Sequence, residues 1–219
     1  MRYVSRFLAI AGFALFGLSQ QASASVVLYD NGPINGTITS FPINFGWAVS
    51  DSFTLSQPST VTGVNFGAWN LPGDTTTSVD WGIANTSATY TVNGTAAVTS
   101  VSSGLLGSGF FPINTDSFAT GSGISLGAGT YYLVLQNAVT GQGNAIYWDQ
   151  NNGPSTASLY NTQSNFDAGS IGSQPFQIIG NVAVTPLPST WMMLLSGFVG
   201  LGFLAYRGTK KNSAALAAA

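Results

Sequence analysis

The sequence predicts an all-β protein: a two-sheet, jelly-roll-like sandwich with an N-terminal signal helix and a C-terminal transmembrane helix. Over residues 25–182, short runs rich in Val, Ile, Thr and aromatic residues recur between clusters of Gly, Asn, Pro and Ser, and helical periodicity is weak. Each end of the chain instead carries an apolar run beside basic residues. These observations divide the chain into a signal peptide (1–24), an extracellular β domain (25–182) and a C-terminal segment (183–219) of linker, short motif, membrane helix and basic tail.

The N-terminal segment has the three parts of a secretory signal. Two arginines lie within the first six residues, and residues 7–18 (FLAIAGFALFGL) form an apolar run that is too short to span a bilayer comfortably. Ala22 and Ala24 then stand two positions apart, in the small-residue pattern of a cleavage site. The sequence therefore predicts export and a mature chain that begins at Ser25.

Ten short strands are expected in the domain. The run Thr130–Gln136 (TYYLVLQ) is the most strand-like, and we expect it to be central. Asn93-Gly94 suits a type I′ hairpin turn, because both residues accept a positive φ. The stretch Ser102–Gly129 is rich in Gly and Ser and predicts long loops. The expected strands lie near Val26–Tyr29, Asp51–Leu55, Thr60–Trp69, Ser78–Ala84, Ala88–Val92, Ala96–Val101, Gly129–Gln136, Asn144–Asp149, Ala157–Tyr160 and Pro175–Val182.

Charge is sparse and unevenly placed. Charged residues make up 5% of the chain, against roughly 25% in ordinary soluble domains. All five basic residues lie at the ends, whereas the seven acidic residues are aspartates between them, so residues 25–206 carry a formal charge of −7. Nucleic-acid binding and electrostatic attraction to anionic lipid both need Lys or Arg, and we expect neither of the domain.

The residue types exclude most catalytic chemistry. The chain has no His and no Cys, which removes Ser-His-Asp triads, thiolate nucleophiles and the usual zinc sites. A pair of Asp carboxyls is sufficient for glycoside hydrolysis in principle, but the aspartates are scattered in turn-like settings. We expect no enzyme, and an Asp-based glycoside hydrolase remains a minor alternative.

Two similar loop sequences are the candidate binding site. Tyr29-Asp30-Asn31-Gly32-Pro33 resembles Trp148–Pro154 (WDQNNGP), and each follows an apolar strand. One interpretation is good turn chemistry used twice; the other is that both loops meet at one end of the sandwich and form a site. Such a site would offer oxygen ligands for calcium, or amides and an exposed Trp148 ring for sugar. Its candidate residues are Asp30, Asn31, Trp148, Asp149, Asn151 and Asn152.

The C-terminal segment combines an apolar run with a basic end. Residues 191–206 (WMMLLSGFVGLGFLAY) are uncharged and are followed by Arg207, Lys210 and Lys211. Counted from Leu187, a helix through Tyr206 would be about 30 Å long, enough to cross the hydrocarbon layer. Basic residues favour the cytoplasmic side, which leaves the preceding domain outside.

The same segment resembles a PEP-CTERM sorting tail, in which a Pro-Glu-Pro signature precedes a hydrophobic helix and a basic end. The matching residues are Pro186, Leu187, Pro188, Ser189, Thr190 and Trp191. The resemblance implies processing by an exosortase-type membrane protease, often in bacteria that make extracellular polysaccharide. Leu187 replaces the Glu of the signature, and an ordinary single-span anchor is the alternative.

Together these patterns predict a non-enzymatic bacterial protein that is exported, then anchored in the membrane with its domain outside the cytoplasm or released to the cell surface or extracellular matrix. A carbohydrate-binding module for exopolysaccharide is the main alternative, and it requires Trp148 to face solvent.

Overall fold

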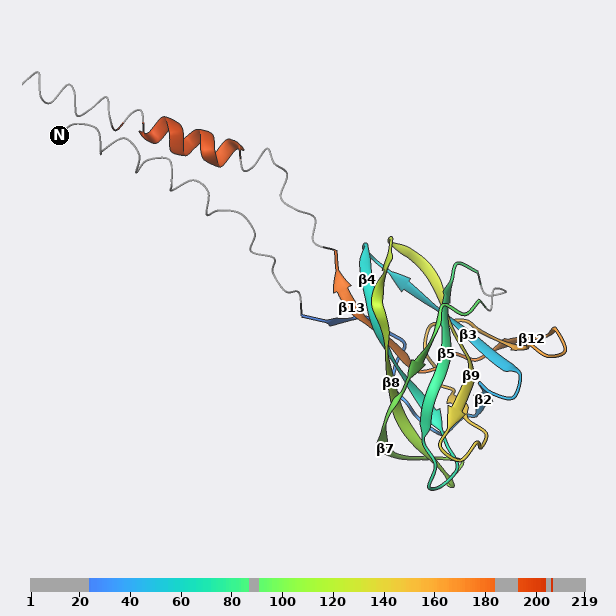
Figure 1. The fold of residues 1–219 in the computed structure, drawn as a ribbon. Coiled ribbons are helices and arrows are strands. Elements are labelled where there is room, and N and C mark those ends of the chain that lie inside the picture. The colour runs from blue at the N-terminus through green and yellow to red at the C-terminus, as the bar shows by residue number, and fades with distance from the viewer. Residues whose placement is uncertain (1–23, 87–90, 184–192, 204–205, 207–219) are drawn as a thin grey trace, which may run out of the picture. The chain divides into compact units, whose positions relative to one another are not determined.

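The computed structural model describes residues 24–86, 91–183, 193–203 and 206, and it shows an all-β sandwich of two antiparallel sheets (Figure 1). The first sheet contains β1 (Val26–Asp30), β2 (Ser40–Pro42), β4 (Ser59–Trp69), β7 (Thr99–Gly107), β8 (Phe111–Leu126), β10 (Tyr147–Asp149) and β13 (Phe176–Val182). The second contains β3 (Trp47–Leu55), β5 (Thr76–Ala84), β6 (Gly94–Ala97), β9 (Gly129–Thr140), β11 (Ala157–Asn161) and β12 (Phe166–Ile171).

The central strands of the two sheets are β4 and β9. β4 pairs with β8 on one side and with β13 and β10 on the other, whereas β9 lies between β3 and β5. Alternate residues of these strands face inward, and the core includes Phe53, Phe66, Leu133 and Phe176, all nearly or fully buried. Full burial of one such side chain contributes about 1.5–3 kcal/mol, so this core is the main source of stability.

Most expected strands are confirmed, including the central run Thr130–Gln136 within β9. The loops expected over Ser102–Gly129 are wrong, because this stretch forms the end of β7 and all of β8. Phe118 packs in the core between the sheets. Ile113 is buried on the opposite, outer face of β8 next to Gly36, and Thr115 and Ser117 share that face. The Gly content marks irregular positions instead: Gly121 and Gly123 have positive φ in the part of β8 where its register with β4 shifts.

The Asn93-Gly94 hairpin turn is also wrong. Neither residue has a positive φ, and Thr91 and Val92 lie outside any strand, while residues 88–90 lie outside the described residues. Asn93 instead binds β5: its N–H donates to the oxygen of Trp81 (2.8 Å) and its Oδ1 accepts from the N–H of Ile83 (2.6 Å). The neighbouring strand expected over Ala96–Val101 is divided between β6 and β7, which belong to different sheets.

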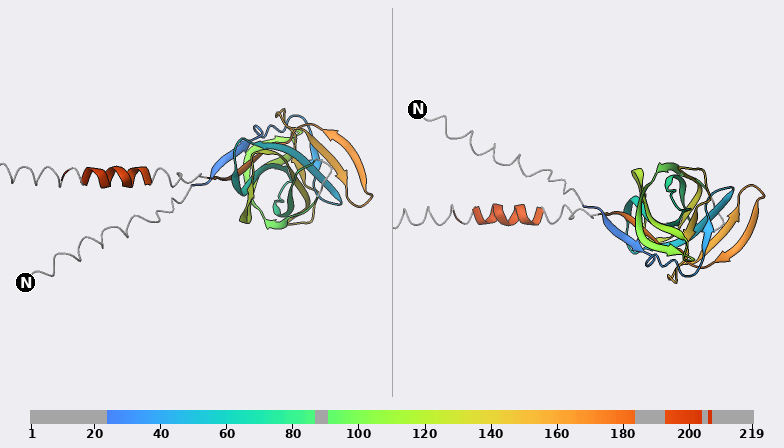
Figure 2. Two further views of the ribbon diagram at one scale, coloured as in Figure 1. Left: turned by 90° about the horizontal axis from the view of Figure 1, so that it is seen from above. Right: turned by 90° about the horizontal axis from the view of Figure 1, so that it is seen from below.

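The first and last strands of the domain lie side by side (Figure 2). β1 and β13 are antiparallel, and Val26 pairs with Gly180. The chain therefore enters and leaves the domain at the same end. Residues 183–219 are a separate unit, in which residues 193–203 are helical. Among the described residues, none of the helical segments is both long and apolar enough to cross a membrane.

Candidate functional site

The two similar loops meet in the structure. One follows β1 and the other follows β10. The Nδ2 atom of Asn151 donates a hydrogen bond to the backbone oxygen of Asn31 (2.6 Å), and Oδ1 of Asn151 accepts one from the N–H of Gly153 (3.0 Å). A Cβ at Gly153 would lie 2.4 Å from the Asn31 oxygen, so only glycine permits this close approach. We call this contact the Asn31–Asn151 junction.

Asn31 is the centre of the junction. Its side chain is fully buried, and its Oδ1 accepts a hydrogen bond from the hydroxyl of Tyr29 (2.8 Å). Its Nδ2 lies within hydrogen-bonding distance of four oxygens, those of the Ser155 hydroxyl (2.6 Å), the Ser173 hydroxyl (2.8 Å), the Gln174 carbonyl (2.6 Å) and the Asp51 carboxyl (3.3 Å). One amide thus joins β1 to the segments that precede β11 and β13.

Asp51 brings the second sheet into the same network. This β3 residue is fully buried, and its Oδ2 accepts hydrogen bonds from the N–H of Gln174 (2.7 Å) and from Nδ2 of Asn31 (3.3 Å). Burial raises the pKa of Asp51 to about 7, although hydrogen bonds from Ser155, Gln174 and Ser52 act to lower it. The junction therefore contains a carboxyl that changes charge near neutral pH.

Asp149 ties the loop after Asn31 to the outer face of the first sheet. Its Oδ1 accepts a hydrogen bond from Nε1 of Trp69 (2.6 Å), and its Oδ2 accepts from the N–H groups of Asn35 (3.0 Å) and Gly36 (3.4 Å). Burial raises the pKa of Asp149 despite these bonds. The carboxyl thus holds loop backbone against the buried Trp69 ring.

Trp148 is a core residue, which corrects the expectation of a solvent-facing sugar platform. The side chain is fully buried, and its Nε1 donates a hydrogen bond to the oxygen of Pro175 (3.0 Å). Its ring makes edge contacts with Phe66 and Phe176, at centroid distances of 6.2 and 5.7 Å. An aromatic residue at the end of a strand has the same sequence pattern whether it packs in the core or faces solvent to bind sugar. The burial of Trp148 could therefore not be predicted from the sequence.

The hydrogen bonds at these loops do not favour the alternative of a calcium site. Both oxygens of Asp149 accept N–H donors, and Oδ1 of Asn151 accepts from Gly153 and from Ser173. Asp30 and Asn152 lie at the surface. Donors that point at an oxygen oppose a cation there. Within the described residues, no three acidic side chains come together in a metal-binding group.

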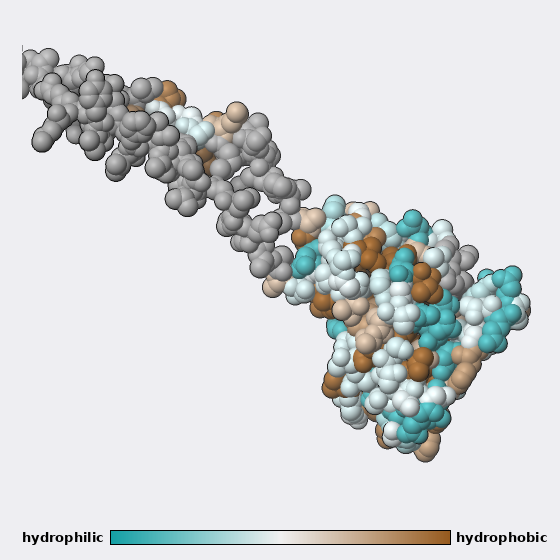
Figure 3. All heavy atoms as spheres, viewed as in Figure 1, coloured by the Kyte–Doolittle hydropathy of each residue, from teal (hydrophilic) through white to brown (hydrophobic). Residues whose placement is uncertain are grey.

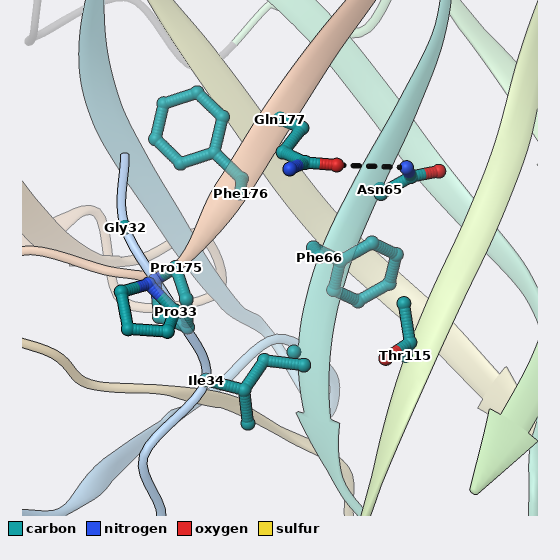
Figure 4. A pocket seen from close by; sticks show the side chains of 10 residues that line it. Gly32, Pro33, Ile34, Asn65, Phe66, Thr115, Pro175, Phe176 and Gln177 are labelled. Atoms are coloured by element: carbon teal, nitrogen blue, oxygen red, sulfur yellow. Dashed lines mark hydrogen bonds between the residues drawn. The ribbon is translucent and has the colours of Figure 1, made fainter. Parts of the chain in front are cut away.

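A pocket of about 190 Å³ opens beside the junction (Figure 4). The amides of Asn65 and Gln177 stand at one side of it, where Nδ2 of Asn65 donates to Oε1 of Gln177 (3.1 Å). Gln177 in turn donates to Oδ2 of Asp30 (2.9 Å), while Pro33 and Ile34 line the opposite side. This volume lies below the roughly 300–1,000 Å³ of ordinary small-molecule sites.

A second buried polar cluster was missed by the sequence reasoning, because it lies partly on β8. Nδ2 of Asn114 donates to Oδ1 of Asn70 (3.1 Å), and Nδ2 of Asn70 donates to the hydroxyl of Thr76 (3.3 Å). Beside them, the hydroxyl of Ser100 donates to Asp116 (2.5 Å). Burial raises the pKa of Asp116 to about 6. Asn114, Asp116 and Phe118 stand at every second position, as residues on one face of a strand do. This pattern was the sequence signal that could have predicted the cluster.

These placements do not favour a glycoside hydrolase. The three aspartates with raised pKa values, Asp51, Asp116 and Asp149, have no exposed surface. A carboxyl must contact the glycosidic oxygen or the sugar carbon to act on it. In the described domain these three groups act as hydrogen-bond acceptors that connect strands and loops.

Several predicted functional residues lie outside the described residues. They are Ala22 of the cleavage site, the motif Pro186, Leu187, Pro188, Ser189, Thr190 and Trp191, and the basic residues Arg207, Lys210 and Lys211. Ala24 is described, and it is exposed two residues before β1 begins.

No protein-family model matches the chain, and a search of curated proteins returns no match.

Proposed function

We propose that this chain is a non-enzymatic, exported bacterial protein that presents its β domain at the cell surface or in the extracellular matrix. The N-terminal 24 residues direct export and are removed. The segment from Leu187 to Tyr206 crosses the membrane, and an exosortase-type protease recognises the Pro186–Trp191 motif and processes the tail.

The observation that carries the proposal is the separation of charge along the chain. Every Lys and Arg lies at position 2 or 6, or from position 207 onward. The β domain between the first and last strands, from Val26 to Val182, contains none of them. Basic residues confined to the flanks of two apolar segments are typical of signal peptides and of membrane anchors.

The arrangement of β1 and β13 supports a tethered domain. Because these strands pair antiparallel, the exported N-terminus and the C-terminal segment leave the domain at one end. The Asn31–Asn151 junction follows the other end of β1. The helical residues 193–203 agree with a helical C-terminal segment.

The test is the fate of the chain in a bacterium that has an exosortase-type protease. Fractionation and N-terminal sequencing should give a mature chain that starts at Ser25 and lies outside the cytoplasm. Replacing Pro186 and Pro188 together with Ala should lower the processed fraction, because the prolines keep the cleavage region extended. Leu187→Glu, which restores the Pro-Glu-Pro signature, should raise it.

Pro58→Ala is the matched control, because Pro58 is an exposed proline of the β3–β4 loop. Processing should be unchanged in this variant. A cytoplasmic chain that retains residues 1–24 would refute export. Equal processing of the double-alanine variant and the original chain would refute sorting and leave a plain anchor.

A further inference from the structure

A hollow of about 280 Å³ lies where the turn between β2 and β3 meets the end of β9. Phe45 lines it and is 63% exposed, the highest value among the aromatic residues described between positions 24 and 183. Val139, also exposed, lines it as well. An exposed aromatic side chain thus stands at the border of a hollow at which no sequence pattern had indicated a site.

The backbone at Phe45 is unfavourable for this residue. The N–H of Trp47 donates to the oxygen of Asn44 (3.0 Å), and the two residues between them have positive φ values, +53° for Phe45 and +83° for Gly46. Turns of this kind strongly prefer Asn-Gly. A bulky residue at positive φ is a true outlier, and such strain collects at functional sites. The turn would be more stable with Asn in place of Phe45.

Two amide side chains that line the hollow are each held by a hydrogen bond to an aspartate. Nδ2 of Asn137 donates to Oδ2 of Asp80 (2.9 Å), and Nδ2 of Asn144 donates to Oδ2 of Asp74 (2.9 Å). Asn137 is itself in a positive-φ conformation, at +47°. Thr140 also lines the hollow, and its hydroxyl accepts a hydrogen bond from the N–H of Asn144 (2.8 Å). The hollow therefore combines one exposed aromatic side chain with fixed polar groups, which is a preorganised arrangement.

We propose that this hollow binds an uncharged polysaccharide, with a sugar ring against Phe45 and its hydroxyls hydrogen-bonded to Asn137 and Asn144. Aromatic rings bind the C–H faces of sugars, and amides both donate to and accept from hydroxyls. An anionic polymer is disfavoured, because the domain has aspartates and no basic side chain to receive it. The inference rests on the proposed function in that a polysaccharide ligand requires an exported domain.

The test is affinity gel electrophoresis of the purified full-length chain in mild detergent, with xyloglucan, galactomannan, laminarin or dextran in the gel and polygalacturonate as the anionic probe. We expect retardation by at least one neutral polymer and none by polygalacturonate. Phe45→Asn should weaken binding at least tenfold and raise the melting temperature, because it removes the contact and the backbone strain together.

Phe110→Asn is the matched control. Phe110 is 59% exposed, packs edge-on against Phe111 and does not have a positive φ, so this variant should bind as the original chain does. Absence of binding to all four neutral polymers, or unchanged binding by Phe45→Asn, would overturn the proposal. The proposal would also be overturned if Phe45→Asn lost only self-association, as measured by sedimentation, and kept its polysaccharide binding. These outcomes are distinct from a failure of export, because binding is measured on purified protein.

Discussion

Asp51 is buried at the contact between the two sheets, in a domain with no cation to pair with it. Its pKa is raised from 3.8 to about 7 because burial disfavours the charged carboxylate. The folded chain therefore keeps a proton that the unfolded chain loses above about pH 4. Asp116 and Asp149 shift in the same direction. All three make the folded state less favourable as pH rises.

The free energy of unfolding should consequently fall between about pH 4 and pH 7 and level off above pH 7. The rise in the pKa of Asp51 from 3.8 to about 7 corresponds to about 4 kcal/mol. Urea denaturation at closely spaced pH values measures the effect. In Asp51→Asn the slope between pH 6 and 7 should be clearly smaller, whatever its absolute stability. The control Asp167→Asn changes an exposed residue and should keep the slope; a stability that rises through this interval would contradict the argument.

Single residues also mark the limit of what the sequence could predict. The similarity of the two Asp-Asn loops led to the alternative in which they meet, and they do meet through Asn31 and Asn151. The burial of Trp148 depends on which face of β10 is covered, which is decided by distant strands. The exposed Phe45 was not predictable, because local preference opposes a positive φ for Phe.

At the scale of elements, composition found the strands that bury apolar side chains and missed those that do not. β4 and β9 are rich in Val, Leu and aromatic residues and were predicted. β8 has a sequence of Gly, Ser and Thr interrupted by a few inward residues such as Phe118, and this composition is also that of a loop. Its strand conformation depends on pairing with β4 and β7, which are non-local contacts.

Among the described strands, β7 is an edge strand that pairs only with β8. Val101 and Leu106 are exposed on it, and it carries no charged residue. On the face seen in Figure 3, apolar residues are interspersed with residues of intermediate hydropathy over much of the domain. Natural edge strands are usually protected from pairing with other chains by charge, particularly by Lys. β7 has no such protection.

Placing Lys on β7 should therefore reduce aggregation without altering the fold. Val101→Lys keeps the backbone pairing with β8 and removes no core contact, so the free energy of unfolding should change by less than about 0.5 kcal/mol. Light scattering at increasing protein concentration should show a higher solubility limit. Ser170→Lys, at an exposed position on β12 in the second sheet, is the control for added charge alone. Equal gains from both variants would show that net charge, not the β7 edge, is responsible.

At the scale of the whole domain, repulsion among the aspartates disfavours the folded state. Burial of apolar side chains and hydrogen bonding favour it. Residues 25–206 carry seven aspartates and no Lys, Arg or His, so no intramolecular ion pair exists there for salt to weaken. Like charges repel more strongly in the compact state than in the expanded chain. Screening by salt therefore only weakens repulsion in this domain. In proteins that have both signs of charge on their surface, it weakens attraction as well.

Raising NaCl from 10 mM to 500 mM should thus raise the melting temperature at pH 8. The Debye length falls from about 30 Å to a few ångströms over this range, so repulsion between separate aspartates is largely removed. Asp30→Asn with Asp167→Asn eliminates two exposed charges and should reduce the dependence on salt. Because each is replaced by a side chain of the same shape, changed packing does not account for the difference. A melting temperature that stays constant or falls with added salt would mean that repulsion among these aspartates is not a significant term in the stability of the domain.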